Sequence, residues 1–146
     1  MEEKMCFFIG HRDTPQDVFS ALEQAVERQI AQYGVTEFVV GHYGNFDAMA
    51  AQAVQRAKQR HPMVTLTLLL PYHPTERQIS LPQGFDNSFY PPGMETTPRR
   101  VAIVRANRYM ADHCDCLIAC VRHPGNAREL LEYAKKKENI HVENLV

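Results

Sequence analysis

The feature of this sequence that most restricts its fold is the alternation of apolar runs with helically spaced segments. Five runs rich in β-branched or aromatic residues have the length of strands, at 5–9, 36–40, 64–70, 116–121 and 140–146. Most of the stretches between them repeat apolar residues every three or four positions, which is typical of helices. Strands that are apolar throughout are buried on both faces, so the pattern predicts a three-layer α/β fold with a parallel five-stranded sheet.

Length and charge limit the domain organisation and the classes of partner. The 146 residues suit a single domain over 1–146. Sixteen basic and seventeen acidic residues give a formal net charge of -1, so no general binding of nucleic acid or of an anionic membrane is expected. The apolar run at 64–70 is far shorter than the ~20 residues that span a bilayer, and the first residues lack the pattern of a signal peptide. The sequence therefore predicts a cytoplasmic protein.

Two proline pairs predict helix starts. Thr14 before Pro15 and Thr97 before Pro98 each combine an N-cap hydroxyl with a proline at the first helical position. Between the third strand and the second of these starts lies a connection over about 71–97 that is rich in proline and aromatic residues. A connection of this length in a compact domain is typically functional or mobile. We interpret it as a lid over a site or as a contact surface, either for a partner protein or within a homodimer.

Polar residues and glycines follow the predicted strands. In a parallel sheet all the strand C-termini lie on one edge, where open α/β folds bind their ligands. Glycines there let backbone N–H groups approach a ligand, helix N-termini favour anions, and arginines add charge-assisted hydrogen bonds. We therefore predict an anion-binding site, with phosphate as the natural ligand, built from Gly10, His11, Arg12, Gly41, His42, Gly44, Asp47, Arg122, His123, Gly125 and Asn126.

These residues also have simpler interpretations. A glycine after a strand often serves only the turn, Arg12 and Arg122 can be solvated, and Asp47 can be a first-turn residue of a helix. Because several such features cluster on one predicted edge, we favour a pocket. The clustering does not by itself specify a reaction.

The cysteines are predicted to be reduced core residues rather than metal ligands. Cys116 and Cys120 would lie about 13 Å apart in an extended strand at ~3.3 Å per residue, whereas zinc holds its thiolates about 2.3 Å from one centre. We expect no metal site and no bound cofactor. A site in which His11, His42 and His123 converge from three strand ends stays open as an alternative.

Several ordered motifs together resemble the SLOG superfamily, in particular a small single-domain bacterial branch. The motifs are Gly10-His11-Arg12, Gly44-Asn45-Phe46-Asp47, Tyr90-Pro91-Pro92-Gly93, Arg105 with Asn107, Met110 and Asp112, Arg122-His123, and Leu131-Glu132-Tyr133-Ala134-Lys135. The resemblance implies a Rossmann-like fold with strand order 3-2-1-4-5. It also implies that the strand-end loops bind a nucleotide or a nucleotide-derived molecule, for sensing or sequestration.

The same superfamily includes the LOG-type phosphoribohydrolases, which cleave the N-glycosidic bond of nucleoside monophosphates. Their loop has the form Pro-Gly-Gly-x-Gly-Thr-x-x-Glu. Here the segment from Gly125 to Glu129 matches only its second half, with Asn126 in place of threonine. By the resemblance, Glu129 and Arg105 would be the catalytic residues of such a hydrolase, which is the alternative to a binding module. A protein-interaction module is the third interpretation.

Overall fold

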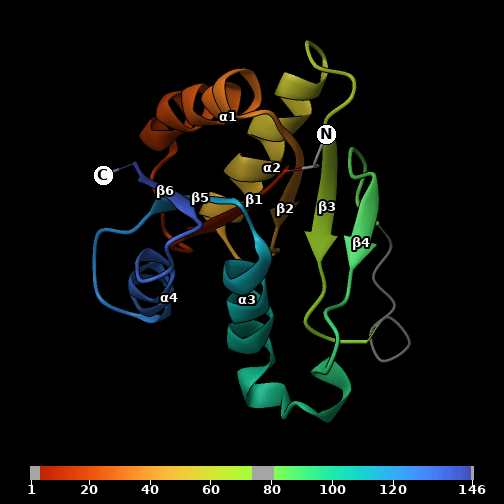
Figure 1. Cartoon of the computed structure of the whole chain (residues 1–146), viewed down its shortest axis with the longest axis vertical. Coiled ribbons are helices and arrows are strands. Elements are labelled where there is room, and N and C mark those ends of the chain that lie inside the picture. The colour runs from red at the N-terminus through yellow and green to blue at the C-terminus, as the bar shows by residue number, and fades with distance from the viewer. Residues whose placement is uncertain (1–3, 74–80, 146) are drawn as a thin grey trace.

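The computed structural model describes residues 4–73 and 81–145 and contains a six-stranded, all-parallel sheet in the order β4-β3-β2-β1-β5-β6 (Figure 1). The strands are β1 (Lys4–Gly10), β2 (Val35–Val40), β3 (Thr65–Leu69), β4 (Asn87–Phe89), β5 (Cys116–Cys120) and β6 (His141–Asn144). The helices are α1 (Phe19–Tyr33), α2 (Asn45–Lys58), α3 (Ala102–His113) and α4 (Asn126–Lys135), with short 3-10 turns η1 (Gln16–Val18), η2 (Met94–Thr96) and η3 (Arg99–Val101).

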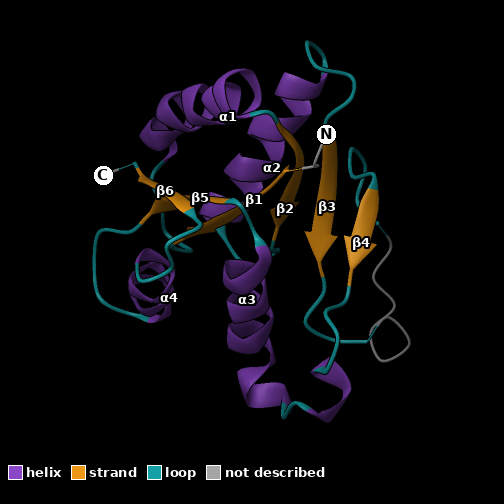
Figure 2. Ribbon diagram, viewed as in Figure 1, coloured by secondary structure: helices purple, strands orange, loops and turns teal. Residues whose placement is uncertain are grey.

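The sheet lies between two helical layers. Helices α1 and α2 cover one face, and α3 and α4 cover the other (Figures 1 and 2). The three-layer α/β prediction is thus confirmed. The five strands predicted from the sequence lie in the predicted relative order, as β3-β2-β1-β5-β6.

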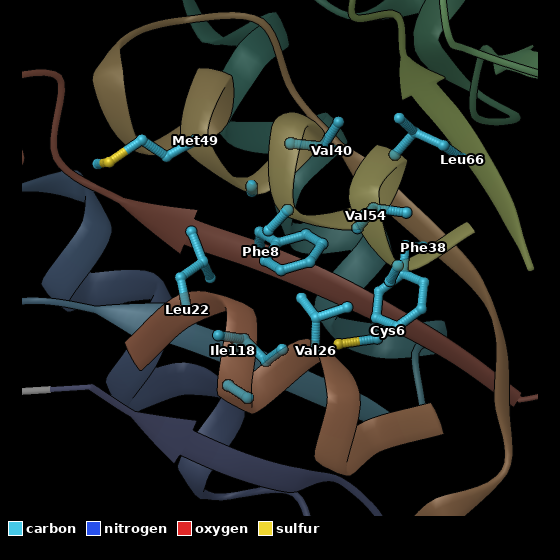
Figure 3. Close-up of a cluster of buried hydrophobic side chains, with 14 of the residues drawn as sticks. Cys6, Phe8, Leu22, Val26, Phe38, Val40, Met49, Val54, Leu66 and Ile118 are labelled. Atoms are coloured by element: carbon cyan, nitrogen blue, oxygen red, sulfur yellow. The ribbon is translucent and has the colours of Figure 1, made fainter. Parts of the chain in front are cut away.

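Successive residues of the central strands enter two separate cores. Phe8 and Phe38 pack with stacked rings against α1 and α2, in the cluster shown in Figure 3. Their neighbours Phe7 and Val39 point to the opposite face and pack with α3 and α4. This two-sided burial explains why these strands are apolar at every position rather than at alternate ones.

The prediction of five strands was wrong by one. The connection over 71–97 contains β4, which pairs in parallel with β3 through Leu68↔Ser88 and Leu69↔Phe89. The sequence Asn-Ser-Phe has no apolar run, because a short strand at the edge of a sheet is covered on few sides. Residues 74–80 of this connection, and residue 146 of the last predicted strand, lie outside the described residues.

The two predicted N-caps were also wrong. The hydroxyl of Thr14 donates a hydrogen bond to the carbonyl oxygen of His11 at 2.7 Å, and that of Thr97 donates to the carbonyl oxygen of Gly93 at 3.2 Å. Both threonines therefore stabilise turns before the helices. Pro15 and Pro98 instead precede the 3-10 turns that lead into α1 and α3.

The parallel strands place all their C-terminal ends on one edge of the sheet. Helices α2, α3 and α4, which follow β2, β4 and β5, begin near that edge. This edge carries the turns after β1, β2 and β5. Over residues 4–73 and 81–145, no helix combines the length and the apolar composition that a membrane span requires.

Candidate functional site

The turns after β1, β2 and β5 line a single cleft with a volume of about 370 Å³. It lies where strand order reverses, since β1 has β2 on one side and β5 on the other. Most of the predicted binding residues line it: Gly10, His11, Arg12, Gly41, Gly44, Asp47, His123, Gly125 and Asn126.

His11 connects the turn after β1 to the turn after β5. Its Nε2 accepts hydrogen bonds from the backbone N–H of Arg122 at 3.0 Å and from that of His123 at 3.4 Å. Because Nε2 is the acceptor, the ring is neutral and its proton is on Nδ1. Burial, and secondarily the neighbouring His123, lower the pKa of His11 below its usual value.

His123 lies flat against His11. Their ring centroids are 3.6 Å apart and the planes differ by 13°. Nδ1 of His123 lies 3.1 Å from the carbonyl oxygen of Pro124, and its Nε2 lies 3.7 Å from a carboxylate oxygen of the exposed Asp13. The two imidazole rings therefore form a stacked pair at the mouth of the β1–β5 crevice.

Gly125 begins α4 with a backbone conformation that favours glycine. Its φ is 142° and its ψ is -168°, a region in which a Cβ atom is strained. The first N–H groups of a helix have no partner within the helix, and Asn126 and Ala127, at the start of α4, line the cleft. This part of the cleft is suited to an anion.

Gly10 is required by close packing within the protein. A Cβ atom there would lie 2.3 Å from Cγ of Phe46, which is at the start of α2. A hydrogen bond also joins the turn after β1 to the start of α2, since the N–H of Asn45 donates to the carbonyl oxygen of Arg12 at 3.0 Å. The absence of a side chain at Gly10 thus positions α2 against β1.

Asp47 places a carboxylate at the opposite side of the cleft. One of its oxygens accepts the backbone N–H of Tyr43 at 3.0 Å. Burial raises the pKa of Asp47 to about 6, although this N–H and the nearby His42 act in the other direction. Asp47 can therefore accept hydrogen bonds from hydroxyl or amino groups within the cleft, besides stabilising the turn before α2.

One wall of the cleft was missed by the sequence analysis. Arg100 of η3 and Ile103, Val104 and Asn107 of α3 complete it. The sequence does contain a signal for this wall. A helix that follows a parallel strand begins near the edge of the sheet where the strands end. The proline before this helix, followed by two arginines, marked a basic N-terminal turn at that edge.

Four predicted site residues do not line the cleft. The side chains of His42 and Arg122 are exposed, and the backbone N–H of Arg122 is bonded to His11. Arg105 lines a separate hollow on the outside of α3, and Glu129 is exposed in the first turn of α4. The fold thus does not bring the proposed catalytic pair, Arg105 and Glu129, into the cleft.

The histidines and cysteines are not grouped into a metal centre within the part of the chain that the structure describes. No three His, Cys, Asp or Glu side chains are grouped as metal ligands within 4–73 and 81–145, so the alternative of a three-histidine site is not supported. The four cysteines are unpaired and buried, as predicted: Cys6, Cys114, Cys116 and Cys120. Burial raises the pKa of the Cys114 thiol to about 12, which opposes formation of a thiolate.

No protein-family model and no curated protein matches the sequence. Solved structures do match the fold. The molybdenum cofactor binding protein from Rippkaea orientalis is 15% identical with a TM-score of 0.65, over 99% of this chain and 78% of that one. The Moco Carrier Protein from Chlamydomonas reinhardtii is 16% identical with a TM-score of 0.55, over 97% and 89%.

A third structure belongs to a protein that acts on DNA. It is DNA processing protein A from Helicobacter pylori, described for its single-stranded DNA binding mode, at 16% identity and a TM-score of 0.59. The match covers 95% of this chain and 64% of that one. At these identities the likeness concerns the fold. The chain therefore has a Rossmann-like fold similar to that of these three proteins.

Proposed function

We propose that the cleft at the C-terminal ends of β1, β2 and β5 binds a nucleotide or a nucleotide-derived molecule. The observation that carries the proposal is the convergence of three strand-end turns, distant in the sequence, on one cleft at the point of reversed strand order. Its volume of about 370 Å³ falls within the range of small-molecule sites, roughly 300–1,000 Å³.

The two sides of the cleft suit different parts of such a ligand. The N-terminus of α4 and the guanidinium groups of Arg12 and Arg100 favour a phosphate group. Asp47 accepts hydrogen bonds from ribose hydroxyls or from amino groups of a base. Ile103 and Val104 offer apolar surface to a ring.

The structural relatives support this class of ligand. Two of the similar structures are described as molybdenum cofactor binding or carrier proteins, and one as binding single-stranded DNA. For this chain the net charge of -1 favours a small ligand over a polynucleotide. We infer a binding or carrier role for a nucleotide-like molecule, with the molybdenum cofactor among the candidates.

A thermal-shift panel tests the proposal. It contains nucleoside phosphates, nicotinamide dinucleotides, ADP-ribose and the molybdenum cofactor. A ligand at about 100 times its Kd adds about 2.7 kcal/mol to the free energy of unfolding, so at least one member should raise Tm by several degrees. If no member stabilises the protein, the proposal fails.

Two variants connect such a shift to the cleft. Arg12→Ala removes a guanidinium from the cleft and should reduce the shift caused by a phosphate-bearing ligand. Arg56→Ala is a matched control, because this arginine lies on α2 and pairs with Glu23 outside the cleft. Equal losses in the two variants would show that the ligand binds elsewhere.

The same samples test N-glycosidic hydrolysis. Each nucleoside monophosphate is incubated with the protein and then analysed by chromatography for free base. We expect no release, because neither Glu129 nor Arg105 lines the cleft. Release that is lost in Glu129→Ala would establish the hydrolase.

A further inference from the structure

We propose that the cleft binds the anionic group of its ligand together with one proton, which is taken up by the stacked pair His11 and His123. This inference rests on the proposed function, because it concerns regulation of the same site. It predicts that acidification strengthens binding.

His11 places a hydrogen-bond acceptor beside two backbone donors. Its Nε2 accepts the N–H groups of Arg122 and His123, both in the turn between β5 and α4. Strand-end N–H groups of this kind are the donors that a phosphate group needs. His11 thus satisfies within the protein the donors that would otherwise bind an anion.

Protonation of His11 would break this arrangement. A proton on Nε2 turns the acceptor into a donor. The imidazolium N–H and the two backbone N–H groups would then face one another with no acceptor between them. Three N–H donors that point their positive ends at one another repel, and an anion that accepts from all three removes this repulsion.

The stacking of the two rings limits how many protons the pair can hold. With ring centroids 3.6 Å apart, two imidazolium ions would repel each other strongly. The pair therefore takes up at most one proton near neutral pH. We place this proton on Nε2 of His11, because only there does it turn the acceptor of the two backbone N–H groups into a donor.

The charged groups around the pair determine whether anion binding raises or lowers its affinity for a proton. Asp13 faces His123 and favours a proton on the pair, whereas Arg122 and Arg128 disfavour one on His11. Arg12, Arg100 and Asp47 lie on the other walls of the cleft. Burial, His123 and the arginines Arg122 and Arg128 lower the pKa of His11. An anion bound beside the pair reverses the local field and raises its proton affinity.

The expected effect is a dependence of affinity on pH. Wherever the free pair is neutral and the bound pair is protonated, the Kd should rise by up to about tenfold per pH unit. The probes must keep a constant charge across this range. ADP-ribose, through its diphosphate diester, and inorganic sulfate do so between about pH 5.5 and about pH 8, which spans the usual range of histidine titration.

Calorimetric titration of the protein with both probes tests the proposal. At each pH the binding enthalpy is measured in buffers with different ionisation enthalpies, which gives the number of protons taken up. We expect a fraction of one proton per ligand and tighter binding at the lower pH. In His11→Gln the side-chain oxygen can accept the same two N–H groups but does not titrate, so proton uptake and the pH dependence should both be lost.

His141→Gln is the matched control. His141 lies at the start of β6, on the opposite edge of the sheet, against the ring of Tyr33. This variant should keep the proton uptake of the wild type. NMR titration of the imidazole resonances in the wild type gives a second measurement that does not depend on variants. The pKa of the pair should rise when sulfate is present at a saturating concentration.

The outcomes separate this inference from the proposed function. If a probe binds with the same Kd across the pH range and without proton uptake, the inference is wrong while nucleotide binding stands. The same holds if the pKa of the pair does not change with sulfate. If neither probe binds at any pH, the inference is wrong as well. The proposed function fails only if the whole thermal-shift panel fails.

Discussion

Gly10 illustrates at the level of one residue how the sequence can mark a position without revealing its role. A glycine at the end of a strand was expected to let the backbone approach a ligand. In the structure the space beside Gly10 is filled by the ring of Phe46, so the residue also holds α2 close to β1. The neighbourhood of the cleft therefore depends on packing behind it.

Gly10→Ala should lower the free energy of unfolding by about 1–3 kcal/mol, because the added methyl group overpacks the contact with the Phe46 ring. Urea denaturation measures the change. When Phe46→Leu is already present, adding Gly10→Ala should lower the free energy of unfolding by less than it does in the wild type. Additive losses in the double variant would contradict the steric explanation.

Asp47 connects the cleft to the pH dependence of stability. Its carboxyl ionises near its ordinary pKa of 3.8 in the unfolded chain and at about 6 in the folded protein. Between these values the folded state binds more protons, so this group makes stability fall as pH rises, and the loss is complete above about 6.

Asp47→Asn should therefore raise the free energy of unfolding at neutral pH by about 1–3 kcal/mol, given about 1.4 kcal/mol per pKa unit. The amide oxygen still accepts the N–H of Tyr43, and no charge is buried. Urea denaturation across the acid range should show a smaller gain below the ordinary pKa of the carboxyl. Asp13→Asn, at an exposed position, is the control. Equal stability of Asp47→Asn and wild type at neutral pH would contradict the assigned cause.

At the level of elements, β4 is held by contacts that the sequence does not display. The carboxylate of Asp86 accepts the backbone N–H of Leu66 and the Lys58 ammonium, at 2.8 Å and 2.5 Å. The N–H of Leu70 donates to the carbonyl oxygen of Phe89 at 2.8 Å. One side chain therefore fixes the start of an edge strand whose own residues are mostly polar.

Asp86→Ala should destabilise the protein by about 1–3 kcal/mol, because it leaves the N–H of Leu66 without an acceptor. Hydrogen exchange should become faster at Leu70, whose N–H reports on pairing with β4. Asp86→Asn keeps an acceptor for the N–H of Leu66, so its free energy of unfolding should fall by less than that of Asp86→Ala. Unchanged exchange at Leu70 in Asp86→Ala would show that β4 forms without this anchor.

At the level of the whole molecule, one sheet supports two cores. Phe38 belongs to the core under α1 and α2, and Leu117 to the core under α3 and α4, and both are fully buried. Because the central strands contribute to both cores, we expect the chain to unfold as one cooperative unit.

Phe38→Ala should lower the free energy of unfolding by about 3–5 kcal/mol and Leu117→Ala by about 2–5 kcal/mol. Each variant should still show a single urea transition, with coincident curves by circular dichroism and by tyrosine fluorescence, in a chain without tryptophan. Separate transitions for the two probes would indicate two independently stable halves.

The amino-acid sequence is enough to predict the five main strands, the two helical layers and the edge on which the cleft lies. These features follow from local information, since a continuous apolar run marks a doubly buried strand and parallel strands end on a common edge. For the same reason the sequence predicts that His11 and Gly125, which follow different strands, belong to one site.

Which other residues line the cleft, and which predicted ones lie outside it, depends on the packing of the folded chain. The pairing of β4, the wall formed by Arg100 and Asn107, and the stacking of His11 on His123 all join segments far apart in the chain. The separation of Arg105 from the cleft likewise depends on which side of α3 faces the sheet. Such contacts depend on how the packed elements are oriented, and no short stretch of sequence encodes that orientation.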